Sequence, residues 1–129
     1  MILHICGRDE WPPATEDLLA GSSVSTEYRP ASLATEGFVH CSDFGTAHLP
    51  ANRIFAGRTD LVLLVIDTAR LDVPVRWEPA AESDDPAAMP WFPHVYGPIP
   101  ERAVIAVHAF PPDAKGAFTL PTALADNRP

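Results

Sequence analysis

The sequence predicts a single compact α+β domain built on a split, mostly antiparallel sheet, with two short helical segments near the N-terminus. Three observations support this fold class. The 129 residues suit one hydrophobic core, and 47% of them are hydrophobic, which is typical of a globular chain. Fifteen prolines and seven glycines favour short elements and argue against a bundle of long helices. We expect the domain to span residues 1–120 and residues 121–129 to form a C-terminal tail.

The first segment, residues 1–6 (MILHIC), predicts an opening strand because it is short, apolar and followed by glycine. Residues 8–21 predict a helix that ends at Gly21. The helix is expected to begin near Trp11, because the two prolines that follow Trp11 are tolerated only in a first turn. The following residues, 22–36, predict a loop that contains at most a short strand.

The middle of the chain predicts a second core strand and more helix. Residues 37–41 (GFVHC) are the strand, and Ser42 is expected to cap a helical stretch over residues 43–57. Pro50 is expected to break this stretch into two short helices, because a proline in a helix interior removes a backbone hydrogen bond.

The clearest strand is residues 59–67 (TDLVLLVID), whose continuous apolar run predicts burial on both faces. Further strands are expected at residues 73–79, 91–97, 102–110 and, as an edge strand, 115–121. Residues 80–90 predict an acidic loop. No helical pattern separates these later strands, which indicates antiparallel pairing.

The charge balance limits the function classes. With 9 basic and 17 acidic residues the net charge is −8, so we expect no duplex nucleic acid partner. Eight of the nine basic residues are arginines, which either reflects codon usage or provides a local anion site. The longest apolar run, residues 61–66, is far shorter than the roughly 20 residues of a membrane helix. We therefore expect no membrane partner, a cytoplasmic location and reduced cysteines.

Three of the five histidines, His4, His40 and His94, lie in short apolar segments. Side chains alternate along a strand, so His40 is expected to point with Phe38 and Ser42, and a neighbouring first strand can bring His4 to the same cleft. Each histidine alone could be a satisfied core residue. Together, with Tyr96 close to His94 in sequence, they predict a shared polar site.

A metal or a cysteine nucleophile is the alternative use of these residues. Histidine and cysteine are zinc ligands, but the chain has no CxxC or HExxH motif, so we expect no metal. Cys41 faces away from His40 on a strand, and Cys6 is better placed beside His4. Buried structural cysteines are the more common case.

Glu78 lies in a short strand and has two interpretations. It is an acid, base or hydroxyl acceptor in the histidine cleft, or it pairs with Arg76 or another surface arginine, which the sequence slightly favours. Tyr96, Trp91 and Phe92 could stack on a base or nicotinamide ring, or could simply pack in the core.

Several segments together resemble the bacterial family catalogued as domain of unknown function 952, over about residues 1–120. The segments that carry the resemblance are LHI, SLATEGFVHCS, ANRIFAGRTDLVLLVID, RWEP and FPHVYGPIP. That family is grouped by fold with the ADP-ribosyltransferase superfamily. The resemblance implies an NAD site in which His4 holds a ribose hydroxyl and His40, followed by Ser42, packs on the nicotinamide side.

The superfamily's third motif usually brings a glutamate, and here the matching segment offers His94 and Tyr96 instead. Glu78 is the nearest earlier acid. Members that act on an RNA 2′-phosphate also lack the glutamate and use histidine and arginine. For a phosphate, Arg29 and Arg53 are the expected ligands.

Three functions remain open from the sequence. The first is a transferase-like enzyme that acts on NAD or a related nucleotide, with the three histidines, Tyr96 and Glu78 in its site. The second is a module that binds a nucleotide or small anion without turnover. The third is a metal-binding hydrolase. The oligomeric state is left open.

Overall fold

A computed structural model of the chain describes residues 1–11, 27–79 and 91–125. Most of the helix predicted over residues 8–21, the acidic loop at 80–90 and the end of the tail lie outside the described residues. The strands are β1 (Ile2–Gly7), β2 (Glu27–Tyr28), β3 (Val39–His40), β4 (Leu61–Ile66), β5 (Val75–Pro79), β6 (Trp91–Val95), β7 (Ile99–Pro100) and β8 (Val104–Ala109). The α-helices are α1 (Ala31–Glu36), α2 (His48–Ile54) and α3 (Thr122–Ala125). Single 3₁₀ turns are η1 (Arg8–Glu10), η3 (Thr68–Arg70) and η5 (Glu101–Ala103).

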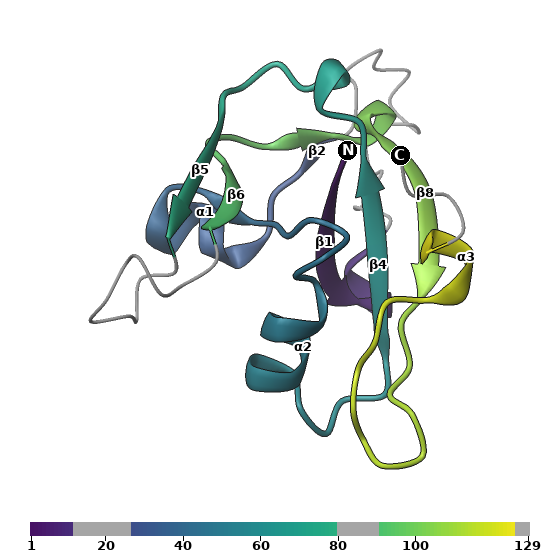
Figure 1. Ribbon diagram of the computed structural model, residues 1–129. Helices are drawn as coiled ribbons and strands as arrows, with labels where there is room; N and C mark the ends of the chain where they lie inside the picture. The colour runs from purple at the N-terminus through teal and green to yellow at the C-terminus, as the bar shows by residue number, and fades with distance from the viewer. Residues whose placement is uncertain (12–26, 80–90, 126–129) are drawn as a thin grey trace.

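The central sheet has the order β1-β4-β8 with both pairings antiparallel (Figure 1). All six residues of β4 are buried, as the apolar run predicted. Alternate residues serve two cores, because Leu64 packs toward β3 and β6, whereas Leu63 packs toward α2 and the C-terminal segment.

A second sheet has the order β3-β6-β5, and β2 pairs with β7; every pairing among the described strands is antiparallel. In Figure 1, β5, β6 and α1 gather on one side of the central sheet. The chain after β3 is tied to β1 by two backbone hydrogen bonds of 2.7 Å between Leu3 and Ser42. Ser42 is therefore a bridge residue and not the helix cap that the sequence predicted.

The helices differ from the sequence prediction in two places. Pro50 is the third residue of α2, where its missing N–H needs no partner, so the helix is continuous and the predicted break is wrong. Residues 31–36, predicted as loop, form α1, which ends at Gly37 in the left-handed region with φ 84°. A six-residue helix has too few turns to show an apolar period in the sequence.

The C-terminal segment also corrects the sequence prediction. Residues 115–121 form no strand; instead the Asn52 side chain accepts from the Phe118 N–H at 2.7 Å and donates to its carbonyl at 3.0 Å. These bonds hold the Phe118 ring in the core beside Phe110. The predicted tail contains α3, whose Leu124 is buried in the same core. Within the described ranges, no helix is long and apolar enough to cross a membrane.

Candidate functional site

Three nitrogen-bearing side chains form one row across the second sheet. His94 of β6 pairs in register with His40 of β3 on one side and with Arg76 of β5 on the other. Residues directly opposite one another project from the same face of a sheet. Because Val39 and Val95 point into the core, the row lies on the opposite face of this sheet.

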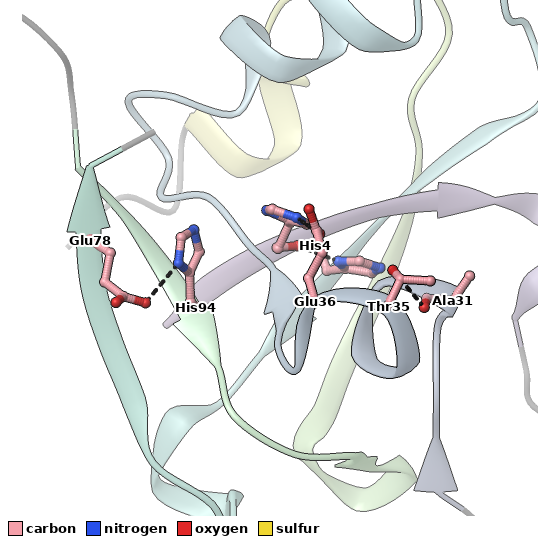
Figure 2. Close-up of polar contacts among 7 residues, drawn as sticks. His4, Ala31, Thr35, Glu36, Glu78 and His94 are labelled. Atoms are coloured by element: carbon pink, nitrogen blue, oxygen red, sulfur yellow. Dashed lines mark hydrogen bonds and ion pairs between the residues drawn. The ribbon is translucent and has the colours of Figure 1, made fainter. Parts of the chain in front are cut away.

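His94 is the most constrained member of the row. Its ring stacks on Phe38 with centroids 4.1 Å apart, and only 8% of its side chain is exposed. Its Nδ1–H donates to Glu78 Oε1 at 2.9 Å, since a carboxylate can only accept (Figure 2). Nε2 of His94 has no hydrogen-bond partner among the described residues. In the same residues, every side-chain N or O atom without a partner is open to solvent. Nε2 is therefore the polar atom that this buried ring presents to solvent.

Glu78 orients the ring from the neighbouring strand β5. Its Oε1 also accepts from the Tyr96 hydroxyl, and these two hydrogen bonds, that from Tyr96 first, lower the pKa of the Glu78 carboxyl below its ordinary value. The same bond to Glu78 raises the pKa of Tyr96. The favoured interpretation of Glu78 as an ion-pair partner of Arg76 or another surface arginine is wrong, because its described partners are His94 and Tyr96.

His40 is the accessible member of the row, with 54% of its side chain exposed. Its Nε2–H donates to Glu36 at the end of α1, one helical turn earlier in the chain. Its ring lies edge-on to His94 with centroids 5.3 Å apart. The site thus contains two imidazoles, each held by its own carboxylate.

His4 lies behind this site in the interior. Its Nδ1–H donates to the backbone carbonyl of His40 at 2.6 Å, and the Tyr28 hydroxyl donates to its Nε2 at 2.9 Å. Burial lowers the pKa of His4 from 6.5 to about 4, so the ring is neutral and this tautomer is fixed. Both ring nitrogens are occupied, which leaves none for the ribose hydroxyl that the resemblance implied. The structure therefore brings His40 and His94 together and keeps the ring of His4 on the other side of β3.

The residues expected to bind a cofactor are dispersed. Ser42 is buried against β1, and Arg29 pairs with Glu27 at 2.8 Å on β2. Arg53 belongs to α2, which packs on the opposite face of the central sheet. The arginine that does lie beside the histidines is Arg76, which the sequence suggested only as a partner for Glu78.

Phe38 and Glu36 are the other residues of the site: the sequence placed Phe38 on the face of His40 without giving it a role, and it did not point to Glu36. Phe38 contacts the rings of His40, His94 and Tyr96. The available signal was alternation, which places Phe38 and His40 on one face, and the four-residue spacing of Glu36 and His40.

The two cysteines are free and buried, and burial raises the pKa of both thiols, that of Cys6 to about 11. A thiol in this state is a poor nucleophile. Among the described residues, no group of three or more histidine, cysteine, aspartate or glutamate side chains is placed to hold a metal ion.

The fold defines the class of protein as a sheet-rich, mixed α/β single domain. Residues 5–107 match the family model described as "Protein of unknown function (DUF952)", and the chain belongs to that family. No curated protein matches the chain.

Solved structures of protein CC0527 from Caulobacter crescentus have the same fold. The crystal structure is 28% identical with a TM-score of 0.72 over 96% of this chain and 97% of that chain. The solution NMR structure is 27% identical with a TM-score of 0.67 over 98% and 97%. These comparisons establish the family and the fold class. The expected likeness to ADP-ribosyltransferases stays a prediction.

Proposed function

We propose that the protein is an enzyme that acts on NAD or a related nucleotide, with His94 as its proton acceptor and donor. The observation that supports this proposal is the state of His94: Glu78 holds one ring nitrogen, Phe38 packs on the ring, and only Nε2 opens to solvent. A carboxylate that fixes one ring nitrogen directs the proton chemistry of the ring to the other.

The chemistry assigned to this site is attack on the nicotinamide ribose. Water or an acceptor hydroxyl forms a bond to C1′ and gives its proton to Nε2 of His94. The bond between C1′ and the nicotinamide nitrogen breaks, and nicotinamide leaves with the electron pair as a neutral molecule. The proton then passes from His94 to solvent, so the overall reaction with water yields ADP-ribose, nicotinamide and one proton.

Aromatic groups suit a planar substrate ring at the same place. Phe38 and Tyr96 lie beside the two histidines, with Phe38 and Tyr96 centroids 5.3 Å apart. Base-to-aromatic stacking stabilises a bound nucleotide by about 1–3 kcal/mol per base. In this proposal His40 borders the nicotinamide, as the family resemblance implies, and His4 supports β3 from behind.

The test is a calorimetric titration of the protein with NAD, followed by chromatography for released nicotinamide. His94→Gln is expected to lower nicotinamide release at least about a hundredfold, the usual loss for a general acid–base group. His40→Ala is expected to weaken NAD binding. The matched control is His108→Gln on β8, which is expected to behave like the wild type. Absence of NAD binding at millimolar ligand, or equal release by His94→Gln and wild type, would overturn the proposal.

A non-catalytic nucleotide-binding module is the second candidate, and one observation favours it. Glu78, the acid nearest the row on β5, has its Oε1 committed to both His94 and Tyr96, and so is partly withdrawn from stabilising a ribosyl cation. NAD binding that depends on His40 with no nicotinamide release from the wild type would select this function.

A further inference from the structure

Arg76 differs from four other arginines of the chain, each of which has a described ion pair. Those four pair with carboxylates: Arg29 with Glu27, Arg58 with Asp60, Arg70 with Asp67 and Arg102 with Asp72. The guanidinium of Arg76 instead lies over the ring of Tyr96, 5.1 Å from its centroid. Within the described part of the chain, no carboxylate lies within ion-pair distance of it.

The nearest candidate acid is already engaged. Glu78 is two residues along β5 from Arg76 and projects from the same face, but its Oε1 accepts from His94 and Tyr96. The cation–π contact holds the guanidinium beside the histidine row, and none of the described carboxylates is an ion-pair partner of its N–H donors. A guanidinium in this setting has N–H donors suited to an oxyanion of a ligand.

We propose that Arg76 binds a phosphoryl group of the ligand, beside His40 and His94. The inference rests on the proposed function for the identity of the site. It deepens that function by naming the chemical group of the ligand that Arg76 binds. The registers of β5, β6 and β3 place the three side chains in one line, so a phosphoryl group at Arg76 lies next to His94, the middle member of the row.

The probe is inorganic phosphate, added to the full chain while NMR follows the ring resonances of His40 and His94. Saturable shifts of both rings in the wild type are expected, and Arg76→Gln is expected to weaken the apparent affinity at least about fivefold, as for loss of a charge-assisted bidentate contact. The matched control is Arg70→Gln on η3, an exposed arginine outside the row, which is expected to leave the affinity unchanged. The same titration with acetate tests whether the site prefers a phosphoryl anion to a carboxylate, since an arginine can bind either.

Three results would overturn the inference: no saturable shift at the two rings, equal affinity in Arg76→Gln and wild type, or acetate binding as tightly as phosphate. The proposed function fails separately. Phosphate binding that depends on Arg76, without NAD binding, keeps the phosphoryl site and removes the NAD proposal. Nicotinamide release that depends on His94 but is indifferent to Arg76, with no phosphate effect, keeps the enzyme and removes the phosphoryl site.

Discussion

His4 and His94 are buried to nearly the same degree, with 6% and 7% of each residue exposed, yet their surroundings assign them different roles. His4 lies between the two sheets, where the His40 carbonyl and the Tyr28 hydroxyl occupy both ring nitrogens. His94 lies on the other face of the second sheet, where Glu78 occupies one nitrogen and the other opens to solvent. Burial alone therefore does not distinguish the two rings; the number of occupied ring nitrogens does.

The pairs that hold the two rings also differ in charge. His4 is held by a backbone carbonyl and a phenol, and burial lowers its pKa to about 4. His94 is held by a carboxylate whose own pKa is lowered by its two hydrogen bonds, so an anion stands beside the ring. The first arrangement disfavours a charged imidazole, whereas the second places a carboxylate against the ring.

The largest expected effect is on the interior ring. Replacing His4 with alanine leaves the Tyr28 hydroxyl and the His40 carbonyl without this partner and opens a cavity between the sheets. We expect the free energy of unfolding to fall by about 4 kcal/mol. Urea unfolding followed by circular dichroism measures this loss, with His108→Ala on β8 expected to stay within about 1 kcal/mol of wild type. A His4→Ala variant as stable as that control would contradict the role assigned to His4.

The pH dependence of stability should also come from His4. Its pKa is about 4 when folded and 6.5 when exposed, so between these values the unfolded chain binds more protons. Stability therefore rises with pH across this window and is lost as the pH falls. Between about pH 7.5 and pH 5, this group should remove roughly 2 kcal/mol.

The measurement is urea unfolding at several pH values in that range for wild type and His4→Asn. Asparagine keeps an N–H near the His40 carbonyl but does not titrate, so its profile should be flatter by the amount that His4 contributes. Identical slopes in the two proteins would show that another group causes the acid loss.

The smallest effect on stability is expected at the outer ring. Glu78→Gln keeps the size of the side chain and removes the charge beside His94, on a carboxyl whose side chain is 37% exposed. We expect the free energy of unfolding to stay close to that of the wild type, because solvent screens a partly exposed pair of this kind. Nicotinamide release, however, should fall at least about tenfold, because the ring loses the carboxylate that orients it. A variant with full activity would remove Glu78 from the site, and a large loss of stability would make its role structural.

Much of the secondary structure was predictable because it depends on local apolar content. The run over β4 is long, uninterrupted and bounded by polar residues, so only a strand buried on both faces accommodates it. In contrast, α1 has six residues and contributes mainly Leu33 to the core, which is too little to form a period. The C-terminal segment near Phe118 was misassigned because side-chain bonds from Asn52, 66 residues away in sequence, hold it.

The candidate site was predictable only as a set of residue types. Alternation placed His40 with Phe38, and composition drew attention to His94, Tyr96 and Glu78. Arg76 could not be assigned beside His94, because that proximity depends on the register between β5 and β6, and register is a property of the hairpin.

The amino-acid sequence by itself determined the sheet-rich α/β class, the doubly buried central strand and the presence of histidines in apolar strands, because each depends on the pattern within one segment. The tertiary structure alone decided which histidine is sealed and which is open. That difference arises from cross-strand partners: Tyr28 reaches the Nε2 of His4, whereas no described side chain reaches the Nε2 of His94. Contacts between segments far apart in sequence, and not the local pattern, distinguish a ring with both nitrogens bonded from a ring with one open nitrogen.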